Sequence, residues 1–198
     1  MTLEIDHIVV CVADLDGAAR AFEAEHGVVS VAGGRHSGQG TANRLIPLGG
    51  TYIELLAAVD PDEARTSALG TWALHRATVP GADGLCLRTD DLDALSAGLG
   101  VSQMEMSRVT PDGLILSWRL AGLERALASG LPFFIAWDIP DDLHPGRIVV
   151  THPAGPLALG RVTISGDVSA LEQWAPGTPN LSYLPGDPGV TFELVSPP

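Results

Sequence analysis

The sequence predicts an α+β fold made of two β-α-β-β-β modules followed by a partial third module. Three observations support this prediction. Residues 3–60 read as a strand, a capped helix and three further strands, and residues 83–140 repeat that order. Residues 141–198 then return to a strand, a short helix and a final strand. We expect the whole chain, residues 1–198, to form a single domain in which residues 61–82 connect the two modules.

The first module opens with a strand that is apolar on both faces. Side chains alternate across a strand, so between Leu3 and Val12 one face carries Ile5, His7, Val9 and Cys11. Because the other face is also apolar, we expect this strand to be covered on both sides. Asp14 then suits the N-cap of a helix, and Gly27 suits its end.

A Gly-rich stretch separates the next strands. The pattern predicts strands at residues 28–32, 43–48 and 51–59, with a long loop between the first two and a tight Gly49-Gly50 hairpin between the others. The loop, GGRHSGQGT, lacks the lysine and the following helix of a phosphate-binding loop. We therefore interpret its glycines as positions of unusual backbone angles.

The second module repeats the first closely enough to be aligned with it. The segment TDDLDAL matches ADLDGAA, which pairs Asp91 with the helix cap Asp14. The same register places Gly84 opposite His7. We expect a short helix in the connector, and turns rather than extended structure between residues 175 and 189.

Composition and charge limit the classes of function. Of the 198 residues, 45% are hydrophobic and 18% are charged, which is enough apolar material for a sizeable core. The net charge of −13 argues against nucleic-acid binding and against docking on anionic membranes. The start, MTLEIDH, lacks a signal-peptide pattern, and no apolar run is long enough to span a bilayer, so we expect a cytoplasmic protein. Cys11 and Cys86 lie in apolar runs and are interpreted as packing residues.

Five segments carry a family resemblance: DHIVVCVADLD, GGRHSGQGTANRLIPLG, YIELL, RVTPDGLILSWRLAG, and LPFFIAWD with HPG downstream. They are spread over residues 6–146, which is about three quarters of the chain. The sequence resembles the vicinal oxygen chelate superfamily, and most closely its glyoxalase-like domain proteins. This resemblance implies paired modules whose curved sheets surround a cleft, implies a small-molecule ligand, and is compatible with a homodimer. The superfamily includes glyoxalases, extradiol dioxygenases and bleomycin-resistance proteins, so the fold alone does not fix the activity.

The resemblance implies that His7 and Glu54 hold a divalent metal ion in the cleft, with Glu54 as a catalytic ligand or proton shuttle. The residues themselves agree, because an ionised carboxylate inside the apolar run YIELL is costly to bury unless it is paired or metal-bound. In the second module, the aligned positions hold Gly84 and Ala136, which are not metal ligands. The alternative is that His7 pairs directly with Glu54 and that no metal binds.

Four side chains are candidates for ligand binding: His36, Thr41, Asn43 and Arg119. The first three lie in or beside the Gly-rich loop, where they would hydrogen-bond a small polar ligand at the mouth of the cleft. An arginine facing the cleft can bind a carboxylate through two hydrogen bonds. The alternatives are a structural hairpin with a solvated histidine, and an ion pair between the arginine and an acidic neighbour. Asp138, His144 or His152, downstream of the second module's last strand, could substitute for the missing metal ligands, although none stands at the family's ligand position. The sequence assigns no other role to His144 or His152.

Three functions are compatible with these residues. As an enzyme, the resemblance implies metal-dependent lyase, isomerase or dioxygenase-type chemistry, in which the metal polarises adjacent oxygens of a small substrate. A binding protein that sequesters a small molecule without chemistry is the main alternative, and the incomplete ligand set favours it. The third is a metal-free enzyme in which His7 orients Glu54 as a base.

Overall fold

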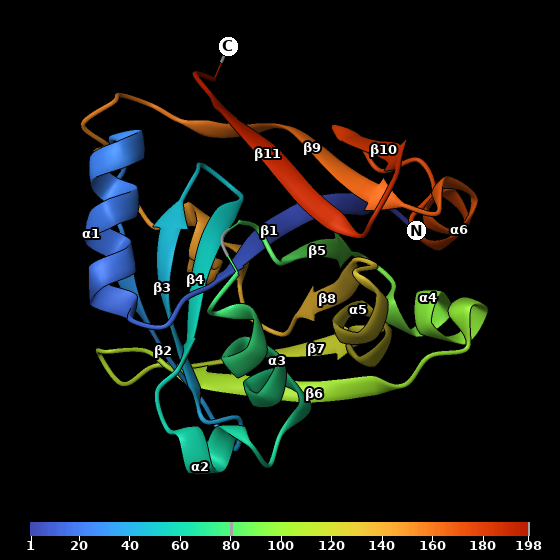
Figure 1. Cartoon of the computed structure of the whole chain (residues 1–198), viewed down its shortest axis with the longest axis horizontal. Coiled ribbons are helices and arrows are strands. Elements are labelled where there is room, and N and C mark those ends of the chain that lie inside the picture. Colours follow the sequence, from blue (N-terminus) through green and yellow to red (C-terminus); the bar gives the residue numbers. More distant parts are fainter. Residues whose placement is uncertain (80, 198) are drawn as a thin grey trace.

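The computed structural model describes residues 1–79 and 81–197 of the chain. Eight strands form a closed barrel, in the order β1-β4-β3-β2-β6-β7-β8-β5, and a separate three-stranded sheet lies against its outside (Figure 1). The first module supplies β1 (Leu3–Cys11), α1 (Leu15–His26), β2 (Val31–His36), β3 (Thr41–Pro47) and β4 (Tyr52–Ala58). This β-α-β-β-β order confirms the sequence prediction.

The second module repeats the order, with one additional helix between its last two strands. It consists of β5 (Gly84–Thr89), α4 (Leu92–Leu99), β6 (Gln103–Val109), β7 (Ile115–Ala121), α5 (Leu123–Ser129) and β8 (Phe133–Trp137). The connector forms two short helices, α2 (Pro61–Ala64) and α3 (Ala68–Arg76). No helix in the described part of the chain is long and apolar enough to cross a membrane.

The two modules close the barrel by pairing at both of their edges. Strands β1 and β5 run antiparallel, with His7 opposite Cys86, while the other junction joins β2 to β6 through only two residue pairs. Within each module the first strand also pairs parallel to the last, as β1 does with β4. The barrel therefore brings the four central strands, β1, β4, β5 and β8, side by side, and their inward side chains face a common interior.

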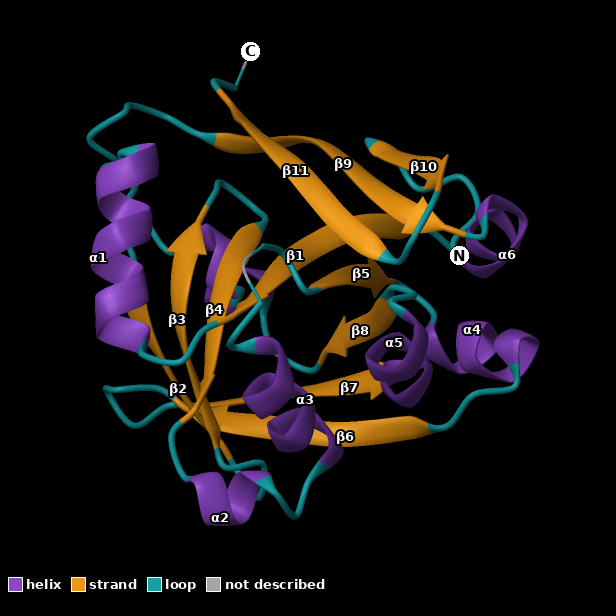
Figure 2. Cartoon of the chain, viewed as in Figure 1, coloured by secondary structure: helices purple, strands orange, loops and turns teal. Residues whose placement is uncertain are grey.

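The third segment of the chain forms the outer sheet. It contains β9 (Ala158–Gly166), α6 (Val168–Trp174), β10 (Leu181–Pro185) and β11 (Gly189–Val195), with β9 in the centre (Figure 2). The expectation of turns throughout residues 175–189 was wrong, because Leu181–Pro185 pairs with β9 as a parallel strand. Proline is tolerated there because it ends an edge strand.

The strands separate two hydrophobic layers. One fills the barrel and includes Val9, Leu56 and Ile135. The other lies between the barrel and the outer sheet, and includes Ile8 and Leu55. Because neighbouring residues on a strand point to opposite faces, a polar residue beside Leu55 is directed into the barrel.

A β-bulge in β1 changes the alternation that the sequence predicts. The register between β1 and β5 shifts between Ile5 and His7. As a result, Ile5 packs with Ile8 in the outer layer, and the expectation that it shares a face with His7 was wrong. Bulges re-aim side chains locally, and this one leaves Asp6 fully buried beside His7.

Most of the predicted Gly-rich loop is strand. Val31–His36 forms β2, and only a short turn joins it to β3. Gly33 and Gly34 are needed for close approach rather than for unusual backbone angles. A Cβ atom at Gly33 would lie 1.9 Å from Asn43 Oδ1, and one at Gly34 would lie 2.3 Å from the Val109 carbonyl oxygen.

We predict that Leu55→Ala lowers the free energy of unfolding by about 2–5 kcal/mol, because Leu55 is fully buried between the barrel and the outer sheet. Chemical denaturation followed by circular dichroism measures this value. Leu184→Ala is the matched control, since Leu184 is 55% exposed and should change stability by less than about 0.5 kcal/mol. Equal losses in the two variants would contradict the assignment of the outer core.

Candidate functional site

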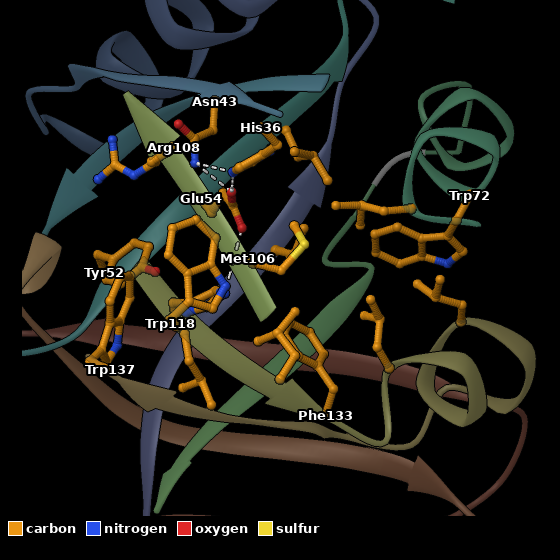
Figure 3. A pocket seen from close by; sticks show the side chains of 18 residues that line it. His36, Asn43, Tyr52, Glu54, Trp72, Met106, Arg108, Trp118, Phe133 and Trp137 are labelled. Atoms are coloured by element: carbon orange, nitrogen blue, oxygen red, sulfur yellow. Dashed lines mark hydrogen bonds and ion pairs between the residues drawn. The ribbon is translucent and has the colours of Figure 1, made fainter. Parts of the chain in front are cut away.

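A cavity inside the barrel brings together several buried polar side chains from both modules (Figure 3). Six polar or titratable residues line it: His7, His36, Asn43, Tyr52, Glu54 and Arg108. The remaining wall is apolar and aromatic, from both modules and from helices α3 and α5. The cavity volume is about 50 Å³, which is room for a few water molecules or a small ligand.

Glu54 occupies the centre of the polar side of this cavity. Asn43 Nδ2 donates a 2.6 Å hydrogen bond to Glu54 Oε1, and His36 Nε2 lies 3.7 Å from the same oxygen. The other oxygen, Oε2, lies 3.5 Å from His7 Nε2, which is longer than a normal hydrogen bond. The prediction that His7 and Glu54 lie side by side in one cleft is confirmed. Their roles as ligands or catalysts stay a prediction.

The neighbours of His7 fix its orientation and its tautomer. His7 Nδ1 lies 2.7 Å from Asp6 Oδ1, and the imidazole stacks on the Tyr52 ring with 4.5 Å between centroids. An ionised carboxylate only accepts hydrogen bonds, so His7 Nδ1 carries the proton. In the neutral imidazole, Nε2 is then left with a free electron pair directed toward Glu54. This is the arrangement of a metal-binding or basic histidine supported by a carboxylate.

Asp6 lies directly behind His7, and the sequence analysis did not single it out. Its carboxylate is completely buried and also accepts hydrogen bonds from Trp137 Nε1, at 3.1 Å, and His144 Nε2, at 3.0 Å. Burial is the largest influence on the pKa of Asp6 and raises it. The hydrogen bonds from His144 and His7 outweigh burial and hold the pKa well below its ordinary value. The signal was an acidic residue inside an apolar strand, directly before His7.

His36, Thr41 and Asn43 form a chain of hydrogen bonds behind Glu54. Thr41 Oγ1 lies 2.9 Å from His36 Nδ1, and Asn43 Nδ2 lies 3.3 Å from His36 Nε2. Burial lowers the pKa of His36, and the nearby Glu54 only partly offsets it, so His36 is neutral near pH 7. The structure brings these predicted residues together on two strands rather than at a loop. Thr41 supports His36 from behind and does not itself line the cavity.

The structure separates Arg119 from the other predicted residues. On β7, Trp118 points into the cavity, so Arg119 points outward. Arg119 Nη1 donates to Asp93 Oδ1 at 3.0 Å, and its Nε lies 3.8 Å from Asp138 Oδ2. The expectation that Arg119 lies in the cleft was therefore wrong, and the ion-pair alternative describes it.

Arg108 is the arginine that lines the cavity. It is buried on β6, two residues after Met106, which also faces inward. Arg44, on β3 of the first module, lies outside the barrel and pairs with Asp16 at 3.3 Å. Strand alternation along β6 was the available signal, but the sequence alone did not show which face of β6 is internal.

The second module contributes an apolar wall instead of further ligands. Phe133, Ile135 and Trp137 of β8 line the cavity, and Ala136 packs against the outer layer. The alignment that placed Ala136 opposite Glu54 was therefore out of register, because Phe133 pairs with Cys86 of β5 as Glu54 pairs with Val9 of β1. Gly84 does face inward, close to Val9 and Phe133.

Two overlapping donor sets are available to a metal ion. The first is His7 Nε2 with the Glu54 carboxylate, which faces open cavity space. The second is Asp6, His7 and Cys86, which offer one ligand atom each within 4.8 Å of one another. Burial, followed by the charges of Asp6 and Glu54, raises the pKa of the Cys86 thiol well above its ordinary value. Because Asp6 is also saturated with hydrogen bonds, the first set fits a divalent ion better.

His152 has a structural role outside the cavity. Its Nδ1 accepts a hydrogen bond from the Val29 amide at 2.9 Å, and its Nε2 donates to the Pro47 carbonyl oxygen at 2.8 Å. These bonds fasten the segment that leads to the outer sheet onto the first module. The other unassigned histidine, His144, donates to Asp6 and accepts from the Gly146 amide at 3.1 Å.

Comparison with solved structures supports the fold. A hypothetical protein from Staphylococcus aureus superposes with a TM-score of 0.75 and 19% identity, covering 94% of this chain and 88% of that chain. Methylmalonyl-CoA epimerase from Streptomyces coelicolor, in complex with 2-nitronate-propionyl-CoA, gives a TM-score of 0.50 and 22% identity, covering 68% of this chain and 97% of that chain. A methylmalonyl-CoA epimerase in complex with methylmalonyl-CoA and NH4+ gives a TM-score of 0.50 and 21% identity, with 68% and 94% covered.

No curated protein sequence matches the chain significantly. The family model of the glyoxalase-like domain, in contrast, matches residues 5–177. This range holds nearly all of both modules, together with β9 and α6. The closed barrel of paired β-α-β-β-β modules agrees with that match. The chain therefore belongs to the glyoxalase-like domain family.

Proposed function

We propose that this protein is a metal-dependent enzyme of the lyase or isomerase type, which moves a proton on a small carbonyl-containing substrate. One observation carries the proposal. His7 Nε2 and Glu54 Oε2 face each other across 3.5 Å inside the cavity, and each residue is fixed from behind. Asp6 holds His7, and Asn43 holds Glu54.

His7 and Glu54 would hold the metal ion, which would act as a Lewis acid on the substrate's oxygen atoms. The hydrogen bond to Asp6 supports this role because ligating histidines almost always donate their second N–H to a carboxylate, a carbonyl or water. We expect a divalent transition metal, since imidazole and carboxylate together suit zinc, iron, manganese or nickel.

Glu54 is suited to accept a proton from carbon when its carboxylate is not bound to the metal ion. Its Oε1 is held by Asn43 at 2.6 Å, which leaves Oε2 as the oxygen that faces His7 and the cavity. A carboxylate that is positioned in this way acts as a general base when the substrate's C–H bond comes within hydrogen-bond reach. The neutral His36 beside it adds no competing positive charge.

The apolar wall defines where the substrate lies. Phe133, Ile135 and Trp118 line the cavity on the side contributed by the second module. Water is poorly held on such a surface, and a charge on Glu54 is therefore more reactive than in solution. We favour proton transfer over oxygen insertion because the most specific polar feature is a base with one oxygen directed into an apolar space.

A binding protein without catalysis is the second candidate. The observation in its favour is the one-sided distribution of polar groups, because β8 presents only Phe133, Ile135 and Trp137 to the cavity. Such a wall would bind the apolar part of a ligand and contribute nothing to its chemistry. A metal-free enzyme in which His7 orients Glu54 is intermediate between the two candidates.

Metal content distinguishes the two donor sets. Protein purified without chelators or a histidine tag should contain about one transition metal ion per chain by elemental analysis. His7→Gln and Glu54→Gln should each lower this content tenfold or more, whereas Cys86→Ala should retain it, because the thiol stays protonated in its buried site. Metal loss in Cys86→Ala with retention in Glu54→Gln would assign the ion to Asp6, His7 and Cys86 instead. A metal-free wild-type protein would support the metal-free enzyme or the binding protein.

A second prediction separates function from packing. Glu54→Gln should leave the melting temperature nearly unchanged, because the amide fills the same volume and its oxygen can still accept from Asn43. The variant should nevertheless lose metal or ligand binding, whereas Leu55→Ala should lose stability. Thermal melts with a ligand-binding screen test both variants. If Glu54→Gln unfolds as readily as Leu55→Ala, Glu54 is structural and the proposed site is wrong.

A third prediction concerns Asp6 and pH. The native pKa of Asp6 lies well below its ordinary value of 3.8, so its ionised form stabilises the fold above that pH, and this contribution is lost as pH falls. Asp6→Asn should therefore be less stable than the wild type at pH 7, in metal-free protein. At pH 3 the difference should shrink by about 1 kcal/mol. Urea denaturation at both pH values measures it, and a difference that does not change with pH would show that Asp6 is not ionised in the fold.

A further inference from the structure

Arg108 is a buried cation without a buried anion beside it. The residue is 4% exposed, and among residues 1–79 and 81–197 no carboxylate oxygen lies within 4.0 Å of its guanidinium. Its one hydrogen bond in this part of the chain is to the Gly33 carbonyl oxygen, from Nη1. Arg108 nevertheless lines the same cavity as Glu54.

An unpaired buried arginine is energetically costly. Arginine keeps its charge in proteins, so it cannot escape the cost of burial by releasing a proton. Burial lowers the pKa of Arg108, and Tyr52 and Glu54 raise it, which places both of these residues within electrostatic reach. The charge is thus neutralised only in part by the protein itself. A buried charge that is kept at such cost indicates a function.

Tyr52 provides a second donor near Arg108. Its ring stacks on His7, and it lines the same cavity as Arg108. Burial, followed by the charges of Asp6 and Glu54, raises the pKa of Tyr52 well above its ordinary value, so the hydroxyl stays protonated. Figure 3 shows Arg108 and Tyr52 on one side of Glu54, with Trp72 on the opposite side.

We propose that Arg108 and Tyr52 form a carboxylate-binding subsite, and that the ligand of this protein is a small monocarboxylic acid with a carbonyl group. The carboxylate would accept hydrogen bonds from the guanidinium and from the Tyr52 hydroxyl. The rest of the molecule would extend toward Glu54 and His7. The choice of a carbonyl group rests on the proposed function, whereas the subsite itself does not.

Charge and size agree with such a ligand. With a net charge of −13, the protein repels anions in general, so selective uptake of a carboxylate requires a local cation. The cavity volume of about 50 Å³ limits the ligand to few non-hydrogen atoms. A small acid would bring the missing negative charge to Arg108 and would leave the barrel closed around it.

The test compares acids with their neutral amides. Thermal melts of the wild type are recorded with pyruvate and 2-oxobutyrate, and separately with pyruvamide and 2-oxobutyramide. At least one acid should raise the melting temperature by about 3 °C when present at tenfold its dissociation constant, and its amide should not. Equal shifts for acids and amides, or no shift with any acid, would overturn the proposal.

Two arginine variants locate the effect. Arg108→Met should abolish the acid-induced shift and should melt at or above the wild-type temperature without ligand, since it removes an unpaired buried charge. Arg119→Met is the matched control, because it changes the net charge equally but lies outside the barrel and should keep the shift. If Arg108→Met instead melts at a lower temperature and retains the acid-induced shift, Arg108 stabilises the fold through its hydrogen bond to Gly33, and the proposal is wrong. Should Arg108→Met fail to fold, Arg108→Lys decides, with a shift weakened at least fivefold expected and an unchanged shift overturning the proposal.

Glu54→Gln separates this proposal from the proposed function. The variant should lose metal or activity but keep the acid-induced shift, because the carboxylate-binding subsite remains intact. Loss of the shift in Glu54→Gln, with normal folding, would mean that the acids bind at the metal site and not at Arg108. A metal-free wild type that still responds to acids and not to amides would remove the proposed metal chemistry while supporting the subsite.

Discussion

The buried carboxylate of Asp6 is the interaction on which the arrangement of the site depends. It joins three parts of the chain, since His7 belongs to β1, Trp137 to β8 and His144 to the segment before the outer sheet. Without these three donors, burying an ionised carboxylate would be prohibitively costly. With them, Asp6 fixes the tautomer of His7 and so leaves Nε2 directed at Glu54. A residue that does not touch the cavity therefore decides what the cavity's histidine can do.

The site is asymmetric although the barrel is built from a repeat. The first module supplies the donors and acceptors around Glu54, including His36 and Asn43 from β2 and β3. The second module supplies mainly apolar wall, with Arg108 as its polar exception. The first module thus supplies most of the polar side chains that line the cavity, and the second module supplies most of the apolar wall that excludes water. This division agrees with either an enzyme for a small amphiphilic substrate or a selective binding protein.

The sequence predicted the order of elements well, because helix caps such as Asp14 and Asp91 and the strand periodicity are local signals. It also predicted the pairing of His7 with Glu54, since both lie on strands of one module. It could not show that Arg108 lines the cavity and that Arg119 does not. Which face of a strand points inward depends on how the strand pairs in the barrel, and a shift of one residue reverses it. The bulge at Asp6, the extended β2 and the strand at Leu181–Pro185 were missed for a related reason. Each depends on which strands pair with it, and local sequence patterns do not show that pairing.

The contact between Gly33 and Asn43 has a consequence for how this site tolerates change. Asn43 Oδ1 is buried without a hydrogen-bond partner in the described structure, and it lies where a side chain at position 33 would begin. A single methyl group there would push the amide away from Glu54, and the carboxylate would lose its firmest hydrogen bond. The hydrogen bond between Asn43 and Glu54 thus requires that residue 33 has no Cβ atom. Gly33 therefore constrains the site although it has no side chain and takes part in no chemistry.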